Sequence, residues 1–304
     1  MDILHNLSDI ALRYMPKRWF LTMRTSYFAL RRTLEPALRF KYGTFDTASL
    51  RTHLEERLGS DFEILMVHSS VNHMSPYYQG NPLELVRMLI DFCGPNRTLV
   101  MPAFYFGDPK IGSVHETFKA NPKYDLKRTP SQMGLATELF RRSRDVVQSR
   151  HPVYRVSALG PLAKELVQGH ENASGPAGFG SPFEYMAAHN TLIIGIGKSF
   201  HVMTQVHHVD EIMGDAFPVP RKTTNQDSNP KVTVIDGKDE VPVILHGTGI
   251  QWRFNIAKLP ELLKGGDLEY WKFHNVPLFA AHAHNVTNSL IEAAKEGKTL
   301  YDPV

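Results

Sequence analysis

Fifteen histidines are spread along the chain, so position must decide which of them could do chemistry. His151 is followed by Pro152, and the residue before a proline is pushed out of the helical region, which predicts this imidazole exposed on a bend and not buried within a helix. Imidazole is suited to accept a proton from an amine near neutral pH when a carboxylate orients it. Asp210 and Glu211 are candidates for that carboxylate. On residue types alone, the pairing of His151 with Asp210 is one of several arrangements.

Other polar residues come directly after a buried strand. The apolar run over residues 63–67 ends at His68, Ser69 and Ser70. In open α/β sheets the binding sites lie at the carboxyl ends of the strands, so these three side chains are expected to line a site.

Two further classes of site fit the residues less well. His207 and His208 with Asp210 and Glu211 supply imidazoles and carboxylates, which are common zinc ligands. Their spacing matches neither the His-Glu-x-x-His pattern nor a zinc finger, and adjacent histidines on a helix cannot point the same way. No metal is therefore expected. A serine hydrolase is disfavoured because Ser69 and Ser70 lack the glycines of a nucleophile elbow.

A capped helix is predicted to lead into the turn that carries His151. Thr129 reads as the N-cap, Pro130 as the first helical residue and Gln132 as the partner in a capping box. Apolar residues at helical spacing follow in residues 135–140. The first turn of such a helix could receive a phosphate.

The surrounding elements indicate an α/β fold. Helices are predicted over residues 47–58 and 82–92, and strands over 63–67 and 98–102, so that strand, helix and strand form a parallel crossover unit. Downstream we expect strands at 156–159 and 191–196, helices at 162–166 and 181–188, a helix around His207, a hairpin over 232–245 and helices near 258–264 and 285–296. Residues 105–127 are predicted to be a long loop, and 169–180 a flexible glycine-rich connector.

Composition gives a typical globular protein with a basic N-terminal arm. Residues 1–45 are predicted to be a helical, amphipathic arm and residues 46–304 a single α/β domain. Basic and aromatic residues alternate over 13–41, which suggests packing on the body or a second subunit, or peripheral contact with an anionic membrane.

The single cysteine, Cys93, lies in an apolar run and is expected to be buried. The absence of a signal sequence or membrane span predicts a cytoplasmic protein, and a net charge of +3 does not indicate nucleic-acid binding.

Several short sequence blocks, which follow one another in a fixed order, say more about the fold and the function. Over roughly residues 60–215 the chain contains LMVHSSV, GPNRTLVMPAF, TPSQMGLATELFRR, SRHPVYRVSALGPLA, FGSPFEYM, LIIGIG and TQVHHVDE. Together they resemble the aminoglycoside 3-N-acetyltransferase family, also called the antibiotic N-acetyltransferase family. The resemblance implies a three-layer α/β/α fold with a mixed, mainly parallel sheet and an acetyl-CoA-dependent enzyme that acylates an amine on a sugar ring.

The resemblance also implies roles for individual residues. His151 matches the histidine of the family's His-Pro block and is the implied general base. Asp210 falls where the family has a glutamate, one methylene longer, so Glu211 is kept as the alternative partner. Contacts to acetyl-CoA are implied for Ser69, Ser70, Thr129 and Ser131. His68 joins this predicted set because it ends the same strand, and Asn72, His207 and His208 are predicted contacts to the sugar.

The charge of the chain decides the expected substrate. Aminoglycosides carry several ammonium groups and favour acidic enzymes, whereas this chain has a pI near 8.8. That balance favours a nucleotide-linked amino sugar used in surface polysaccharide synthesis. An aminoglycoside is the first alternative, and a non-catalytic scaffold that binds acyl-CoA is the second. A homo-oligomer is also compatible with the sequence.

Overall fold

The computed structural model describes residues 33–221, 229–247 and 249–303. A seven-stranded sheet forms its centre, in the order β10-β11-β6-β1-β2-β5-β4. The strands of this sheet are β1 (Ile64–Ser69), β2 (Thr98–Pro102), β4 (Val147–Gln148), β5 (Val156–Leu159), β6 (Thr191–Ile196), β10 (Leu268–Phe273) and β11 (Val276–His282). β1 pairs in parallel with β2 and β6, while β5 and β11 run the opposite way. The predicted mixed, mainly parallel sheet is therefore confirmed.

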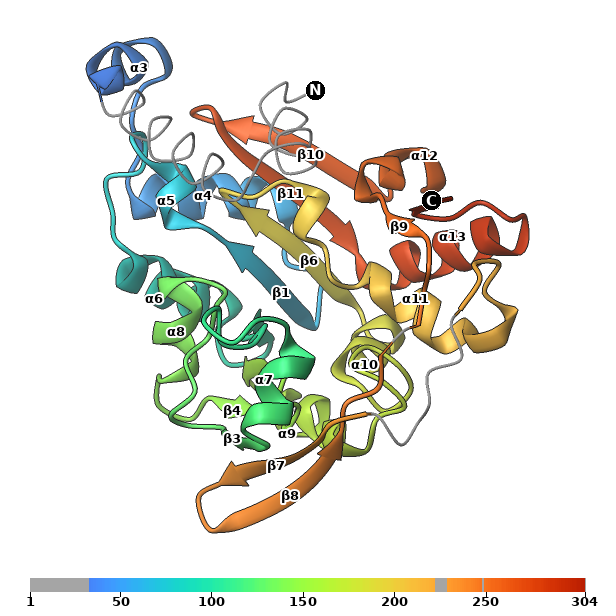
Figure 1. Cartoon of the computed structure of the whole chain (residues 1–304). Coiled ribbons are helices and arrows are strands. Elements are labelled where there is room, and N and C mark those ends of the chain that lie inside the picture. The colour runs from blue at the N-terminus through green and yellow to red at the C-terminus, as the bar shows by residue number, and fades with distance from the viewer. Residues whose placement is uncertain (1–32, 222–228, 248, 304) are drawn as a thin grey trace.

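Alternate residues of the strands bury two separate cores, because successive side chains of a strand point to opposite faces. Ile64 and Met66 of β1 face one core, which is covered by α9 (Ala163–Val167), α10 (Pro182–Ala188), α11 (Val206–Met213) and α13 (Ala283–Lys295). Leu65 and Val67 face the other, under α4 (Thr47–Leu58), α6 (Pro82–Cys93) and α8 (Leu135–Arg141). Figure 1 shows α6 and α8 on one side and α11 and α13 on the other, so the predicted three-layer arrangement is confirmed.

Local signals explain where α6 begins and ends. Asn81 accepts hydrogen bonds from the backbone N–H groups of Leu83 and Glu84, and Pro82 occupies the first turn. Gly94 ends the helix with φ of 61°. These are the capping residues that the ends of a helix require. The thiol of Cys93 in the last turn is buried, as expected, and burial raises its pKa to about 12.

Two smaller sheets flank the main one. The predicted hairpin is confirmed as β7 (Lys231–Asp236) and β8 (Asp239–Ile244), joined at Gly237, and β3 (Lys123–Asp125) adds to its edge. Figure 1 shows this hairpin extending below the body. β12 (Tyr301–Asp302) pairs antiparallel with β9 (Arg253–Phe254) and brings the C-terminal segment back to α11. The short helix α12 (Leu259–Leu262) follows β9.

Two local predictions are wrong, and one hairpin was not predicted. Residues 105–127 contain α7 (Val114–Ala120) and β3 rather than one long loop, and the capping box of Ser113 and Glu116 was the overlooked signal. The hairpin of β10 and β11 was also missed, because its turn uses His274 and Asn275 at positive φ instead of a glycine. The glycine-rich segment 169–180 begins with a short 3-10 helix and is fixed by side chains described below.

The predicted helix before His151 is present, but its capped start at Thr129 is wrong. α8 begins at Leu135 after Gly134, which makes no side-chain cap. The Gln132 side chain instead donates to the Gly107 carbonyl and accepts from the Phe106 N–H, so a tertiary contact replaces the local capping box.

Part of the predicted N-terminal arm is described. α3 (Glu35–Tyr42) has no fully buried residue, and Leu38 and Tyr42 pack against the core under α4 and α6. Residues 1–32, including most of the basic stretch 13–41, lie outside the described residues. Among the helices of the described ranges, none combines the length and apolarity required to cross a membrane.

Candidate active site

The carboxyl ends of β1, β2 and β6 meet at one edge of the sheet, as their parallel pairing requires. His68 and Ser69 lie there and are both buried. Within the described part of the chain, Nδ1 of His68 and Oγ of Ser69 are buried without a hydrogen-bond partner. Buried polar atoms are normally satisfied, so these two atoms fit contacts to a ligand.

The electrostatics of this edge favour a neutral imidazole beside a cation. Burial, and to a smaller extent the Lys198 ammonium, lowers the pKa of His68 to about 3. Burial also lowers the pKa of Lys198 itself. Gly197 allows the close approach of the strands here, because its φ is 67° and a Cβ would lie 2.5 Å from the Ser70 carbonyl oxygen. Asn72 is exposed on α5 (Val71–Met74), which follows the same strand.

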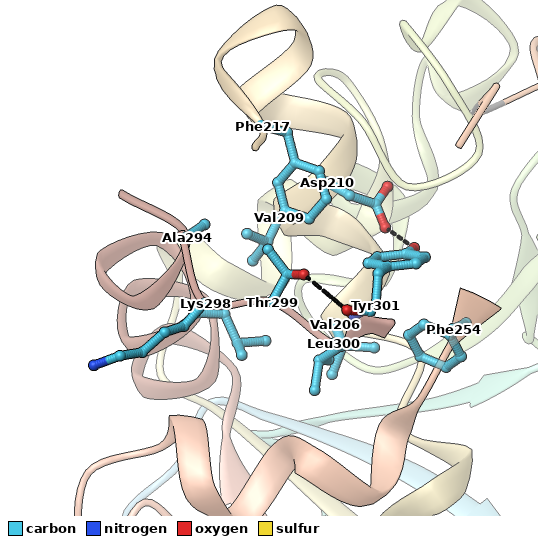
Figure 2. Close-up of a pocket in the computed structure, with 11 residues that line it drawn as sticks. Val206, Val209, Asp210, Phe217, Phe254, Ala294, Lys298, Thr299, Leu300 and Tyr301 are labelled. Carbon is cyan, nitrogen blue, oxygen red and sulfur yellow. Dashed lines mark hydrogen bonds between the residues drawn. The ribbon is translucent and has the colours of Figure 1, made fainter. Parts of the chain in front are cut away.

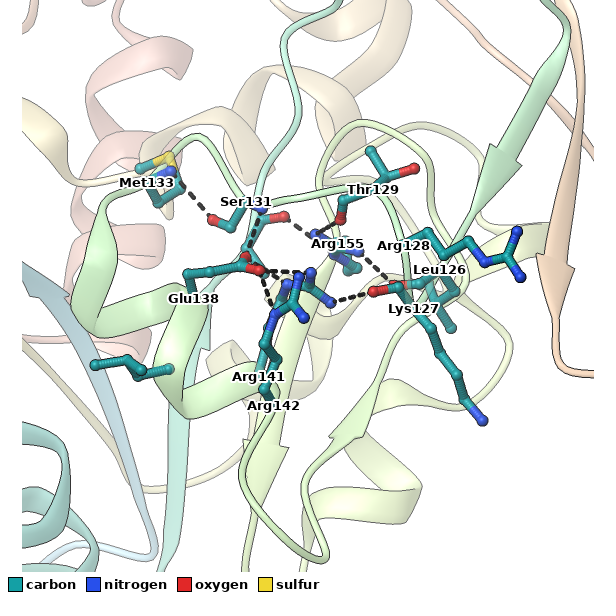
Figure 3. Close-up of polar contacts among 12 residues, drawn as sticks. Leu126, Lys127, Arg128, Thr129, Ser131, Met133, Glu138, Arg141, Arg142 and Arg155 are labelled. Atoms are coloured by element: carbon teal, nitrogen blue, oxygen red, sulfur yellow. Dashed lines mark hydrogen bonds and ion pairs between the residues drawn. The ribbon is translucent and has the colours of Figure 1, made fainter. Parts of the chain in front are cut away.

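The segment that carries Thr129 and Ser131 is held by a buried arginine, as Figure 3 shows. Arg155 donates to the carbonyl oxygens of Ala103, Leu126 and Thr129 at 3.1, 2.7 and 3.2 Å. Its side chain is fully buried. Three charge-assisted hydrogen bonds from one planar group fix this segment beside the end of β2.

A second charged group fixes the same segment from α8. Glu138 accepts from the Ser131 N–H at 2.8 Å and pairs with Arg141 at 2.6 Å. Burial opposes ionisation of Glu138, but the bonds from Arg141, Ser131 and Arg142 prevail and lower its pKa to about 2. Ser131 is thus held by its backbone, while its Oγ accepts from the Met133 N–H at 3.1 Å.

His151 is buried and does not lie on an exposed bend, which corrects the prediction. Its Nδ1 accepts from the backbone N–H groups of Val153 and Tyr154 at 3.2 and 2.9 Å. The ring stacks on His170 with centroids 4.7 Å apart. Burial, then the neighbouring His170 and His246, lowers the pKa of His151 well below its usual value. This imidazole is neutral, and its Nδ1 is occupied by backbone donors.

Among the described residues His151 contacts no acid, and His207 is the histidine beside Asp210. Nδ1 of His207 lies 3.7 Å from Oδ2 of Asp210, three residues further along α11. His207 keeps 26% of its side chain exposed, whereas Asp210 keeps 2%. An accessible imidazole backed by a buried carboxylate is the arrangement that general-base catalysis requires.

Two aromatic rings lie close to His207. The ring of Phe254 lies 4.8 Å and that of Tyr154 6.4 Å from the imidazole, measured between centroids. Tyr154 stacks on Phe104 at 4.7 Å. Because His151 binds the Tyr154 N–H, the predicted catalytic histidine shapes the turn that presents Tyr154 to His207. Neither aromatic residue was predicted, and the sequence offered no periodic signal for either.

Two hydrogen bonds hold Asp210 in place. Its Oδ2 accepts a hydrogen bond from the Tyr301 hydroxyl at 2.6 Å, and its backbone carbonyl accepts one from Arg221. Figure 2 shows the Tyr301 phenol pointing at the Asp210 carboxylate, with Phe254 beside it. Within the described ranges, Oδ1 of Asp210 has no hydrogen-bond partner.

Glu211 and His208 face away from His207 and bind the glycine-rich segment. Oε2 of Glu211 accepts from the Ala177 N–H at 2.8 Å, and Nδ1 of His208 contacts the Ala177 carbonyl at 2.6 Å. Burial, with help from Asp210, raises the pKa of Glu211 to about 8, although the Ala177 N–H opposes this shift. A Cβ on Gly175 would collide with the Glu211 carboxylate, so glycine is needed there. These residues anchor a loop that was predicted to be a flexible connector.

The structure therefore brings together part of the predicted set. His207 and Asp210 form a pair, and His68, Ser69 and Ser70 lie at one sheet edge. His151 binds the turn at Val153 and Tyr154, while His208 and Glu211 bind the glycine-rich segment. The two neighbouring histidines diverge along α11, as their spacing predicts, so they do not converge on one point.

Comparison with known proteins gives the family. The model of the family described as aminoglycoside 3-N-acetyltransferase matches residues 66–288, and the chain belongs to this family. It is 26% identical over 161 residues to aminoglycoside N(3)-acetyltransferase IX of Micromonospora chalcea, covering 50% of this chain and 57% of the relative. It is 29% identical over 170 residues to aminoglycoside N(3)-acetyltransferase IV of a Salmonella species, covering 53% and 57%. The matched part of the chain thus spans a little over half the length of these relatives.

Solved structures agree with the fold. Aminoglycoside acetyltransferase AAC(3)-Xa superimposes with a TM-score of 0.70 at 19% identity, covering 88% of this chain and 99% of that one. AAC-IIIb in its binary complex with CoASH gives a TM-score of 0.67 at 18% identity, covering 86% and 100%. At this level of identity the likeness shows the fold.

The prediction of a nucleotide-linked amino sugar is wrong. The family model and the matched relatives are named for aminoglycosides, which was the stated alternative. The whole-chain charge misled the prediction. Residues 1–42 hold eight Lys or Arg against three Asp or Glu, a net +5, so the remainder of the +3 chain carries −2.

Proposed function

We propose that this chain is an acetyl-CoA-dependent N-acetyltransferase that acylates an amine of an aminoglycoside. The pairing of an accessible His207 with a buried Asp210, in a chain of this family, is the observation that carries the proposal. The −2 charge of residues 43–304 is compatible with a polycationic substrate.

His207 is the proposed general base. It accepts the proton that the amine loses as the amine nitrogen bonds to the acetyl carbon. The C–S bond of the thioester breaks, and coenzyme A leaves as a thiolate that is protonated to the free thiol. Asp210 stabilises the imidazolium that forms, because an opposite charge close by favours the charged state. The separation of 3.7 Å is longer than a hydrogen bond, and contacts of this kind commonly tighten when substrate binds.

Acetyl-CoA is the proposed acyl donor, and when bound it supplies an acetyl group activated as a thioester. Nδ1 of His68 and Oγ of Ser69 have no hydrogen-bond partner among the residues that the structure describes, so both fit contacts to this ligand. Ser70, Thr129 and Ser131 stay proposed contacts. Lys198, beside His68, adds a positive charge that suits the anionic coenzyme.

The amine-bearing substrate is proposed to lie against the aromatic rings around His207. Tyr154 and Phe254 offer apolar faces on which a sugar ring can pack. One relative of known structure, AAC-VIa, is described as bound to sisomicin; it has a TM-score of 0.68 at 20% identity, covering 84% of this chain and 99% of that one. Sisomicin is therefore a suitable first substrate to test.

We also propose the cytoplasm as the place of action, because acetyl-CoA is supplied there. Contact of residues 13–41 with an anionic membrane or with a second subunit stays a proposal about the arm. Vesicle sedimentation of the full chain, with and without anionic lipid, tests the first, and light scattering tests the second.

The decisive experiment measures release of the free thiol of coenzyme A from acetyl-CoA in the presence of single amines. The panel contains sisomicin, gentamicin and glucosamine, and mass spectrometry identifies a product that has gained one acetyl group. We expect turnover with the aminoglycosides that is lost in His207→Asn. A folded protein that binds acetyl-CoA by calorimetry but acetylates nothing in the panel would overturn the proposal and favour an acyl-CoA-binding scaffold.

A further inference from the structure

The last described residues of the chain build one wall around Asp210. Tyr301 lies in β12, opposite Phe254 of β9, and is separated from Asp210 by 91 positions in the sequence. It also lies beyond residue 288, where the family match ends. Figure 2 shows its ring pointing toward α11, between Phe254 and the Asp210 carboxylate.

The contact between Tyr301 and Asp210 is short and buried. The hydroxyl donates to Oδ2 at 2.6 Å, and both side chains are shielded from solvent. The same Oδ2 atom is the one that faces Nδ1 of His207. Burial and the Asp210 charge raise the pKa of Tyr301, so the phenol stays protonated and acts as a donor. A carboxylate that accepts a hydrogen bond from a neutral donor keeps both its charge and its orientation.

Several bonds fix the position of Tyr301 itself. Its N–H donates to Oγ1 of Thr299 at 3.2 Å, and its carbonyl accepts from Nζ of Lys258 at 3.3 Å. Asp302 accepts from the Asn255 side chain at 2.6 Å and pairs with Lys258. The ring of Phe217 meets the phenol edge-on, 5.8 Å away. These hydrogen bonds and the contact with Phe217 therefore fix the position of the Tyr301 phenol.

We propose that Tyr301 is a positioning residue, whose hydroxyl holds the Asp210 carboxylate in the orientation that supports His207 during acetyl transfer. This inference rests on the proposed function. Without the hydroxyl, rotation of the Asp210 side chain is less restricted, because Oδ1 has no partner within the described ranges. His207 then loses its oriented carboxylate while the binding surface for acetyl-CoA is unchanged.

Kinetics of a double-mutant cycle test the proposal. Tyr301→Phe keeps the ring that packs against Phe217 and Phe254 and removes only the hydroxyl that donates to Asp210. We expect kcat to fall about tenfold, the size associated with a single oriented hydrogen bond, with KM for acetyl-CoA within about twofold of the wild type. In an Asp210→Asn background, Tyr301→Phe should cause no further loss, since the hydroxyl acts through the carboxylate. Wild-type kcat in the single variant, or independent losses in the double variant, would overturn the proposal.

Tyr185→Phe is the matched control. Tyr185 donates to Oε2 of Glu165 at 3.1 Å, so it also forms a phenol–carboxylate bond, but on an exposed face. We expect unchanged kcat in this variant. A fall equal to that of Tyr301→Phe would show a general effect of losing such a bond, and the proposal would be withdrawn.

A second readout separates this inference from the proposed function. The ¹⁵N signals of the His207 ring, assigned by comparison with His207→Asn, report the tautomer that Asp210 favours. They should shift in Tyr301→Phe and stay in place in Tyr185→Phe. If wild type acetylates no amine, the proposed function fails while this spectral comparison still decides whether Tyr301 governs His207. Identical His207 signals in wild type and Tyr301→Phe would overturn the positioning role.

Discussion

Nδ1 of His207 lies 3.7 Å from Oδ2 of Asp210, one helical turn further along α11, and no comparable acid faces His151 in the described part of the chain. The i, i+3 spacing places the two side chains on one face of the helix. The helix alone thus sets their proximity, and Phe254 of β9 and Tyr301 of β12 contact the pair from outside the helix.

His207→Asn should lower kcat by about 10²- to 10⁴-fold, the usual contribution of a general base. The unfolding free energy should change little, because the ring is partly exposed and its removal leaves no buried group unpaired. Thiol-release kinetics and a urea titration measure the two quantities. His284→Asn, an exposed histidine on α13, serves as control and should retain full activity. Turnover at the wild-type rate in His207→Asn would remove His207 from the mechanism.

His151→Ala should chiefly destabilise the fold. The variant removes the acceptor for two backbone N–H groups and the stacking partner of His170. A loss of about 2–4 kcal/mol is expected from the unpaired donors and the cavity. Urea unfolding measures this loss, and kinetics at low temperature should show residual turnover. A variant of normal stability without any turnover would return the base role to His151.

Ser69→Ala tests the acetyl-CoA contact at the end of β1. Its Oγ has no partner within the described ranges, so removal costs the protein little and the ligand one hydrogen bond. We expect KM for acetyl-CoA to rise about five- to tenfold with stability unchanged. Ser143→Ala, whose Oγ donates to the Leu139 carbonyl after α8, is the control and should keep the wild-type KM. The same KM in both variants would exclude Ser69 from the contact.

Arg155→Met tests how the segment around Thr129 is held. The variant keeps an unbranched apolar side chain but leaves the carbonyls of Ala103, Leu126 and Thr129 without this donor. We expect a loss of at least about 3 kcal/mol, since each buried unpaired acceptor costs about 1–3 kcal/mol. Arg142→Met, at an exposed arginine of the same region, should cost much less. Equal losses would show that the buried network does not hold the segment.

Glu211 should make the stability of the fold depend measurably on pH. Its pKa is about 8 in the fold against an ordinary value of 4.5, so between these values the folded state binds the proton and the unfolded state has lost it. The favourable contribution of Glu211 to the free energy of unfolding is complete below pH 4.5 and is lost as pH rises toward 8. It amounts to about a few kcal/mol in total.

Glu211→Gln checks that sign. The amide stays neutral and keeps an acceptor for the Ala177 N–H, so the variant should gain stability relative to wild type as pH rises from about 5 to 8. Urea titrations at several pH values measure the difference. Glu261→Gln, at an exposed position, should give a profile parallel to wild type. A parallel profile for Glu211→Gln as well would mean that Glu211 is ionised in the fold.

The sequence by itself determined most of the architecture and the family. The apolar runs of β1, β2 and β6 alternate with capped helices such as α6, and these signals depend on residues only a few positions apart. The hairpin of β7 and β8 was found from Asp236 and Gly237 at its turn. The order of the blocks between residues 60 and 215 identified the family before any geometry was considered.

Only the tertiary structure decided which residues of the site meet. The His-Pro turn suggested an exposed His151, but the backbone of Val153 and Tyr154 folds over its Nδ1 and buries it. Asp210 binds the hydroxyl of Tyr301, which lies 91 positions away in the sequence, and no local pattern predicts such a contact. Caps, turns and periodicity are set by neighbours along the chain, whereas burial and the partner of an acid are set by contacts that exist only once distant segments have packed.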